Sequence, residues 1–481
     1  MLKHLSIFAL FLFAICAPSA AGEDKKAVSD ISKRLAKAVK DGKDEDAVSV
    51  ARELAAVGTP ESLKALFDAG LKIEVPKIYK AVTGILAGLT DEASLKFFQD
   101  QAKAGKELSQ VFLADILAEM KHAQATEILG ILAEERNTVV LRSTISALAR
   151  QKVKGSVEPL LKILERLETN KDHGQVYQEL RDALFEVTSQ DFDVLEDWKK
   201  WWDVAKGTFD PNKKPAGATQ TRKPIRDSAP EFAGKKIFAR NVVFVIDTSG
   251  SMQYVQKDDI PGLSRADGSD KAGGQQAAQE KITPENSRLA KFWTRIEMAK
   301  RALIKAVGAF DAKARINVIR FDTQVIPLEK AGLFPLGPAQ KKKVNDWVKA
   351  MQIKGNTNTK EALVKAFELD RSTTEIYFLS DGIPSADGTK NDPTDPILEK
   401  VEALNRFRKV KIHTFGFDAI SIQQGMEDPG LASANEFLKK LAKRTGGTFT
   451  LMKVTDEKPP KDYRSISGDG TSHGEEPAVR D

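Results

Sequence analysis

The chain has 481 residues, of which 41% are hydrophobic and 30% charged, a composition typical of soluble globular proteins rather than of disordered or membrane proteins. This length suits roughly two or three domains. The net charge of +6 comes from Lys, Arg, Asp and Glu residues interleaved along the chain, which argues against a concentrated basic face for nucleic acid.

Residues 1–21 have the pattern of a secretory signal peptide. Lys3 and His4 precede an apolar run from Leu5 to Ala17, and small residues follow at a cleavage site. The run is shorter than the ~20 residues that cross a bilayer, and no later segment is long enough, so we expect a secreted or periplasmic protein without a transmembrane segment in the mature chain. Cys16, the one cysteine, would leave with this leader. The alternatives are an uncleaved anchor and lipidation at Cys16.

Residues 27–205 carry apolar residues at three- and four-residue spacing, which predicts an all-helical region. Two apolar positions recur in it every 32 or 33 residues. Helix pairs with such a period bury their apolar faces by stacking, so the segment is similar to HEAT or armadillo-type solenoids. The alternative is an irregular helical bundle. The first recurring position holds Leu63, Leu95, Ile128 and Leu160, and the second holds Leu66, Phe98, Ile131 and Ile163.

Two features follow the repeats. Trp198, Trp201 and Trp202 fall on one helical face, which predicts a helix that caps the last repeat rather than a cofactor-binding cluster. Residues 206–234 are rich in Pro, Gly, Lys and Thr and have no apolar periodicity, which predicts an extended linker.

Residues 235–452 alternate strand and helix patterns, which predicts a doubly wound, mostly parallel α/β sheet. In the first helix of this domain, five apolar positions are expected to face the sheet: Ile296, Ala299, Leu303, Val307 and Phe310. The strands are predicted at 237–247, 314–321, 374–381, 411–417 and 447–452, with a short edge strand near Val325. The helices are predicted at 294–310, around 344–351, from 357 past 367, at 397–404 and at 435–446.

Three polar segments lie between or after these predicted strands and helices. The insertion at 253–290 is either a lid or specificity loop or plain disorder, since loops beyond ~15 residues without structure of their own are usually one or the other. Asp387, Asp392 and Asp395 are expected to cap the helix that follows them, with a weak second cation site as the alternative. Residues 453–481 have few apolar residues, and we expect a disordered tail.

Five oxygen-bearing residues occur in the segments VVFVIDTSGS, KGNTNTKEAL and IYFLSDG. Ligands bind outside the carboxyl ends of the strands in open α/β sheets, so side chains released there converge on one crevice. An oxygen-only set suits Mg²⁺, with Mn²⁺ or Ca²⁺ as alternatives. If the acids act through bound water, a sixth position is open for a carboxylate from outside. The set is Asp247, Ser249, Ser251, Thr357 and Asp381.

This set resembles the metal-ion-dependent adhesion site (MIDAS) of von Willebrand factor type A (VWA) domains. The resemblance implies that both serines and the threonine contact the metal directly or nearly so, and that the aspartates bind it directly or through water. It also implies that a partner protein supplies a Glu or Asp side chain. Asn356 departs from the pattern, because many relatives have a second glycine before the threonine. The alternative is a domain of this fold whose loops are hydrogen-bonded and metal-free.

The sequence predicts an extracytoplasmic protein-binding module and not an enzyme. Nucleophilic catalysis needs a base beside the nucleophile, whereas His413 lies within a predicted strand, where a packed or hydrogen-bonded role is expected. We expect the metal to bridge to an acidic side chain of a partner protein, while the helical repeats hold a second protein. The alternatives are a structural scaffold whose metal only stabilises the loops, and a partner subunit of an AAA+ type machine.

Overall fold

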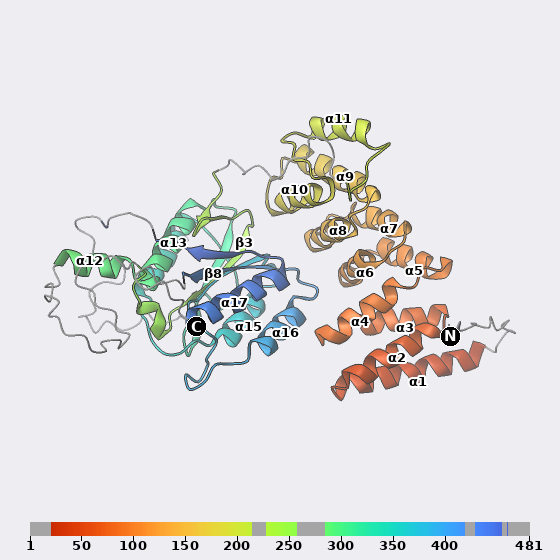
Figure 1. Ribbon diagram of the computed structural model, residues 1–481, viewed down its shortest axis with the longest axis horizontal. Coiled ribbons are helices and arrows are strands. Elements are labelled where there is room, and N and C mark those ends of the chain that lie inside the picture. The colour runs from red at the N-terminus through yellow and green to blue at the C-terminus, as the bar shows by residue number, and fades with distance from the viewer. Residues whose placement is uncertain (1–20, 214–227, 257–283, 419–428, 455–458, 460–481) are drawn as a thin grey trace, which may run out of the picture.

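The computed structural model describes residues 21–213, 228–256, 284–418, 429–454 and 459, and it places an all-helical domain beside an α/β domain (Figure 1). The predicted leader, apart from its last residue, and nearly all of the predicted tail lie outside the described residues. Within the described ranges, no helix combines the length and apolar character needed to cross a bilayer.

The first domain consists of stacked helices, as the periodicity predicts. Helices in alternate positions contact one another, so that α3, α5 and α7 form one row and α4, α6 and α8 form another. The first helix begins at Ala21, earlier than the predicted start at residue 27. The bounds are α1 (Ala21–Lys40), α2 (Asp44–Ala56), α3 (Pro60–Gly70), α4 (Pro76–Ala87), α5 (Glu92–Lys103), α6 (Glu107–Glu119), α7 (Gln124–Leu132), α8 (Thr138–Gln151), α9 (Val157–Thr169), α10 (Gln175–Thr188) and α11 (Leu195–Ala205).

The repeated apolar positions explain the stacking. The first position lies once in each of α3, α5, α7 and α9, and its four side chains are buried: Leu63, Leu95, Ile128 and Leu160. Helix starts are fixed locally, for example at α3, where the Thr59 hydroxyl accepts a hydrogen bond from the backbone N–H of Ser62. The repeat is therefore one helix pair long, and its apolar faces form one continuous core.

The ends of the predicted linker belong to the two domain cores. At its start, the ring of Phe209 lies 5.6 Å from both Trp201 and Trp202, whose helix α11 packs on α9. At its end, Phe232 lies in a two-strand ribbon and is fully buried against Phe244. The linker prediction was therefore too long, because single aromatic anchors carry no periodicity that sequence reasoning can detect.

The second domain is a mostly parallel sheet with helices on both faces, as predicted. Its strand order is β5-β4-β3-β7-β8-β9, with β5 and the unpredicted β6 antiparallel to β4. The strands are β1 (Glu231–Phe232), β2 (Lys235–Lys236), β3 (Asn241–Asp247), β4 (Arg315–Phe321), β5 (Val325–Pro327), β6 (Phe334–Pro335), β7 (Glu375–Leu379), β8 (Lys411–Phe417) and β9 (Phe449–Met452). The helices are α12 (Pro284–Phe292), α13 (Arg295–Ala309), α14 (Pro338–Ala350), α15 (Thr359–Leu369), α16 (Thr394–Asn405) and α17 (Pro429–Thr445).

Side chains along each strand alternate between the two faces of the sheet, and each face has its own hydrophobic core. Phe244 and Ile246 of β3 face α13 and α14, whereas Val243 and Val245 face the side covered by α15, α16 and α17. The five apolar positions predicted to face the sheet from the first helix are all buried. The predicted insertion 253–290 contains the start of α12, so its expected lack of structure was wrong from residue 284 onward, and residues 257–283 lie outside the described residues.

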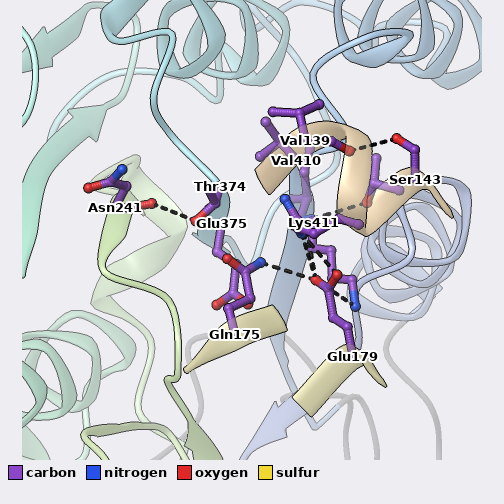
Figure 2. Close-up of polar contacts among 12 residues, drawn as sticks. Val139, Ser143, Gln175, Glu179, Asn241, Thr374, Glu375, Val410 and Lys411 are labelled. Atoms are coloured by element: carbon purple, nitrogen blue, oxygen red, sulfur yellow. Dashed lines mark hydrogen bonds and ion pairs between the residues drawn. The ribbon is translucent and has the colours of Figure 1, made fainter. Parts of the chain in front are cut away.

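The two domains meet at the amino ends of the parallel strands. Lys409, just before β8, bonds both carboxylate oxygens of Asp115 in α6, at 2.7 and 2.9 Å. Figure 2 shows Lys411 at the start of β8 beside Glu179 of α10, with a distance of 3.1 Å between Nζ and Oε1. Phe407 packs its ring against Tyr79 of α4. These contacts hold the helical domain at the edge of the sheet that lies opposite the carboxyl ends of the strands.

Candidate metal centre

The two predicted acidic ligands leave the sheet side by side. Asp247 is the last residue of β3, and Asp381 follows the end of β7 by two residues. Because Ile246 pairs with Leu379 in the parallel register, the chains after both strands emerge at the same edge. Asp247 is fully buried and Asp381 is 4% exposed.

The loop after β3 brings both serines to Asp381. The backbone N–H of Ser249 donates to Asp247 Oδ1 at 2.8 Å, which folds the chain back over the strand end. The hydroxyls of Ser249 and Ser251 lie 3.3 Å apart, and Ser251 Oγ donates to Asp381 Oδ1 at 2.7 Å. Three of the five predicted side chains, those of Ser249, Ser251 and Asp381, are therefore in direct contact, and the Asp247 side chain joins them through the backbone of Ser249.

The loop before α15 places Thr357 against this group. The N–H of Gly250 donates to the carbonyl of Gly355 at 3.1 Å, which joins the two loops. A Cβ on Gly382 would lie 2.8 Å from Thr357 Oγ1, so the threonine hydroxyl approaches the backbone directly after Asp381. The structure thus brings all five sequence-predicted residues together at one edge of the sheet.

Asn356, the departure from the family pattern, is accommodated by a glycine elsewhere. Gly388 has a φ of +73°, and a Cβ there would lie 2.5 Å from Asn356 Oδ1. The backbone N–H of Asn356 also donates to Thr323 Oγ1 at 3.0 Å. The larger side chain therefore fits because the facing loop has no side chain at residue 388.

Electrostatics at this edge favour the arrival of positive charge. Burial, followed by the neighbouring charge of Asp381, raises the pKa of Asp247 to about 7, although hydrogen bonds from Ser249 and Ser380 act to lower it. A buried carboxylate beside another carboxylate is stabilised by any cation between them. The donor set of two carboxylates and three hydroxyls is chemically suited to a hard divalent ion such as Mg²⁺.

Two residues at this centre were missed from the sequence. Ser380 donates its hydroxyl to Asp247 Oδ2 at 2.5 Å, and Arg295 Nη1 donates to Asp381 Oδ2 at 2.6 Å. Ser380 had a detectable signal, since it lies next to Asp381 in the strand-end motif. Arg295 lies 86 positions before Asp381, and that pairing depends on the tertiary fold.

The three acids predicted to cap a helix, Asp387, Asp392 and Asp395, lie between the end of β7 and the first turn of α16. Asp387 Oδ1 accepts the backbone N–H of Thr389, and Asp392 Oδ2 accepts that of Ala386, both at 2.9 Å. Asp395 lies in the first turn of α16. Two of the expected caps therefore stabilise the loop before the helix, and only Asp395 lies at the helix start.

His413 is buried and hydrogen-bonded, as expected. Its Nδ1 accepts the backbone N–H of Thr448 at 3.1 Å, and its Nε2 lies 3.8 Å from Glu375 Oε1. Glu375 and His413 lie at the amino ends of their strands, away from the candidate metal centre.

Comparisons with known proteins bear on the fold family of the second domain. Residues 288–451 match the von Willebrand factor type A domain family. The chain is 32% identical over 103 residues to human (Homo sapiens) von Willebrand factor A domain-containing protein 3A, covering 21% of this chain and only 7% of that relative's length. A solved von Willebrand factor type A structure from Catenulispora acidiphila is 14% identical with a TM-score of 0.29, covering 46% of this chain and 40% of the other. Residues 288–451 are thus a VWA domain, preceded by an all-helical N-terminal region.

Proposed function

We propose that this chain is an extracytoplasmic protein-binding module in which a divalent metal, Mg²⁺ by preference, bridges to a Glu or Asp side chain of a partner protein. VWA domains are generally protein-interaction modules, and the match to that family supports the binding role. The observation that carries the metal role is the convergence of five oxygen-bearing side chains at one sheet edge.

The proposed metal ligands differ in charge. Ser249, Ser251 and Thr357 would offer uncharged hydroxyls, so they would leave the positive charge of the ion largely uncompensated. Asp247 would hold the ion through a carboxylate that is already oriented by Ser380 and by the N–H of Ser249. A bound divalent ion would supply an electrophilic centre for an incoming carboxylate.

The domain arrangement supports simultaneous use of two surfaces. The helical domain contacts the amino ends of the strands through Lys409 and Lys411, whereas the candidate metal centre lies at their carboxyl ends. The helical domain therefore leaves the proposed metal edge uncovered. We propose that its stacked repeats present the surface for a second protein.

A capture experiment with matched variants tests this function. The full chain is immobilised and exposed to an extracytoplasmic extract in the presence of Mg²⁺, and bound protein is eluted with EDTA. Asp247→Ala is expected to lose the EDTA-eluted protein. Asp387→Ala is the control, because this nearby acid accepts backbone hydrogen bonds within its own loop and should retain capture. Equal capture by wild type and Asp247→Ala, unchanged by EDTA, would refute metal bridging.

A further inference from the structure

A buried arginine holds one of the proposed metal ligands. Arg295 Nη1 lies 2.6 Å from Asp381 Oδ2, and the two side chains are 9% and 0% exposed. Ser251 donates to the other oxygen of the same carboxylate. Both oxygens of Asp381 are thus engaged by protein donors, and one of those donors is a full positive charge.

The guanidinium group lies in a site built for it. Its Cζ lies 5.4 Å from the ring centroid of Tyr254 and 5.6 Å from that of Phe417, within cation–π range. With the side-chain amide of Gln256 turned so that its oxygen faces the guanidinium, that oxygen accepts from Nε at 2.7 Å and from Nη2 at 3.0 Å. The backbone N–H of Arg295 donates to the carbonyl of Tyr254, which fixes the start of the helix beside the site. Two aromatic rings and the Gln256 amide therefore surround the guanidinium group.

The position of this arginine is unfavourable without Asp381. Arg295 is the first residue of α13, where the helix dipole favours negative rather than positive side chains. Burying a guanidinium is also costly unless it is paired. The pairing with Asp381 offsets both costs, so the carboxylate and the arginine stabilise each other.

We propose that Arg295 is a resident cation that competes with the divalent metal for Asp381, and so sets the metal affinity of this domain below that of its ligand set alone. This inference rests on the proposed metal-dependent function. A divalent ion and a guanidinium at the same carboxylate repel each other, and the repulsion is strong in a buried site. The charge of Arg295 at Asp381 Oδ2 therefore opposes the binding of a metal ion at Oδ1, the oxygen that faces Ser251.

Titration of the full chain with Mn²⁺, followed by electron paramagnetic resonance of the free ion, tests the competition. Arg295→Gln removes the charge and is expected to bind Mn²⁺ on the order of tenfold tighter than wild type, equivalent to ~1.4 kcal/mol. The melting temperature of Arg295→Gln should also rise more on Mn²⁺ addition than that of wild type, since metal replaces the missing counter-charge.

Arg181→Gln is the matched control. Arg181 Nη2 pairs with Asp191 Oδ1 at 2.5 Å in the helical domain, with side chains 10% and 1% exposed. This variant loses a comparable buried pair away from the candidate centre, so it should lose stability while keeping wild-type Mn²⁺ affinity. If Arg295→Gln does not fold, Arg295→Lys replaces it, because a lysine cannot bond both Asp381 and Gln256 in the same way and should tighten Mn²⁺ binding to a smaller extent.

The outcomes separate the inference from the proposed function. If wild type binds Mn²⁺ and the Arg295 variants bind it equally or more weakly, the competition is refuted and the metal site stands. If neither wild type nor the variants take up Mn²⁺ at millimolar concentration, the metal site itself is refuted, and the competition with it.

Discussion

The two edges of the sheet in the VWA domain use buried charge in opposite ways. At the amino edge, the Glu179 carboxylate accepts hydrogen bonds from Nε and Nη2 of Arg142 and also forms an ion pair with Lys411. At the carboxyl edge, Asp247 and Asp381 lie together, and Arg295 pairs with Asp381. The first cluster has two cations for one carboxylate, whereas the second has two carboxylates for one arginine. This difference distinguishes a structural contact between domains from a site that can accept a cation.

Two fully buried carboxylates illustrate the contrast. Burial dominates at Asp247 and raises its pKa to about 7. Burial also acts to raise the pKa of Glu375, but His413, the Tyr377 hydroxyl and the charge of Arg142 together bring it below its usual value. The partners of Glu375 therefore outweigh its burial, whereas those of Asp247 do not.

The largest expected effect comes from breaking the charge cluster at the amino edge. Glu179→Ala leaves Arg142 buried without its carboxylate, since that arginine side chain is only 3% exposed. The free energy of unfolding should fall by about 4 kcal/mol. Urea denaturation of the full chain measures this loss, and Mn²⁺ affinity should stay at the wild-type value. A loss below 1 kcal/mol would show that the buried pair of Glu179 and Arg142, which joins α10 to α8, contributes little to stability.

A second prediction concerns Lys300, a buried lysine that donates hydrogen bonds to backbone carbonyls. Lys300 donates to the carbonyls of Lys349 and Met351 near the end of α14, and burial lowers its pKa from 10.5 to about 8, against the opposing charge of Glu297. Between these two pH values the unfolded chain binds more protons than the folded chain, so this group makes stability rise with pH. The contribution is about 3 kcal/mol over the window.

Lys300→Met removes that titration. The stability difference between wild type and Lys300→Met should change by about 3 kcal/mol between pH 8 and pH 10.5, in favour of wild type at the higher pH. Urea denaturation at a series of pH values measures it, and other titrating groups cancel in the difference. A difference that does not vary with pH would contradict the assignment.

The smallest expected effect concerns the loop geometry at the carboxyl edge. Gly388→Ala introduces a Cβ at a positive φ and against the Asn356 side chain, so stability should fall by about 1–2 kcal/mol. Adding Asn356→Gly removes the clash but not the backbone strain, so the double variant should recover part of the loss in thermal denaturation. No recovery would show that Asn356 does not determine the loop fit.

Sequence reasoning succeeded where the signal is periodic or concentrated. The core positions of α13 follow a helical period, and the strand ends carry their acids within short motifs, so both the fold and the five clustered side chains were predictable. Phe232 and β6 escaped because a single anchor or a two-residue strand has no period. The role of Arg295 was not predicted, because its partner Asp381 is distant in sequence and only the tertiary fold brings the two together.

Calorimetric titration of the purified full chain with Mg²⁺ and Mn²⁺, beside Asp247→Ala, tests whether the five clustered side chains bind a metal. We expect saturable binding of one ion to wild type and none to the variant. Absence of binding to wild type at millimolar metal, or equal binding by the variant, would contradict this expectation.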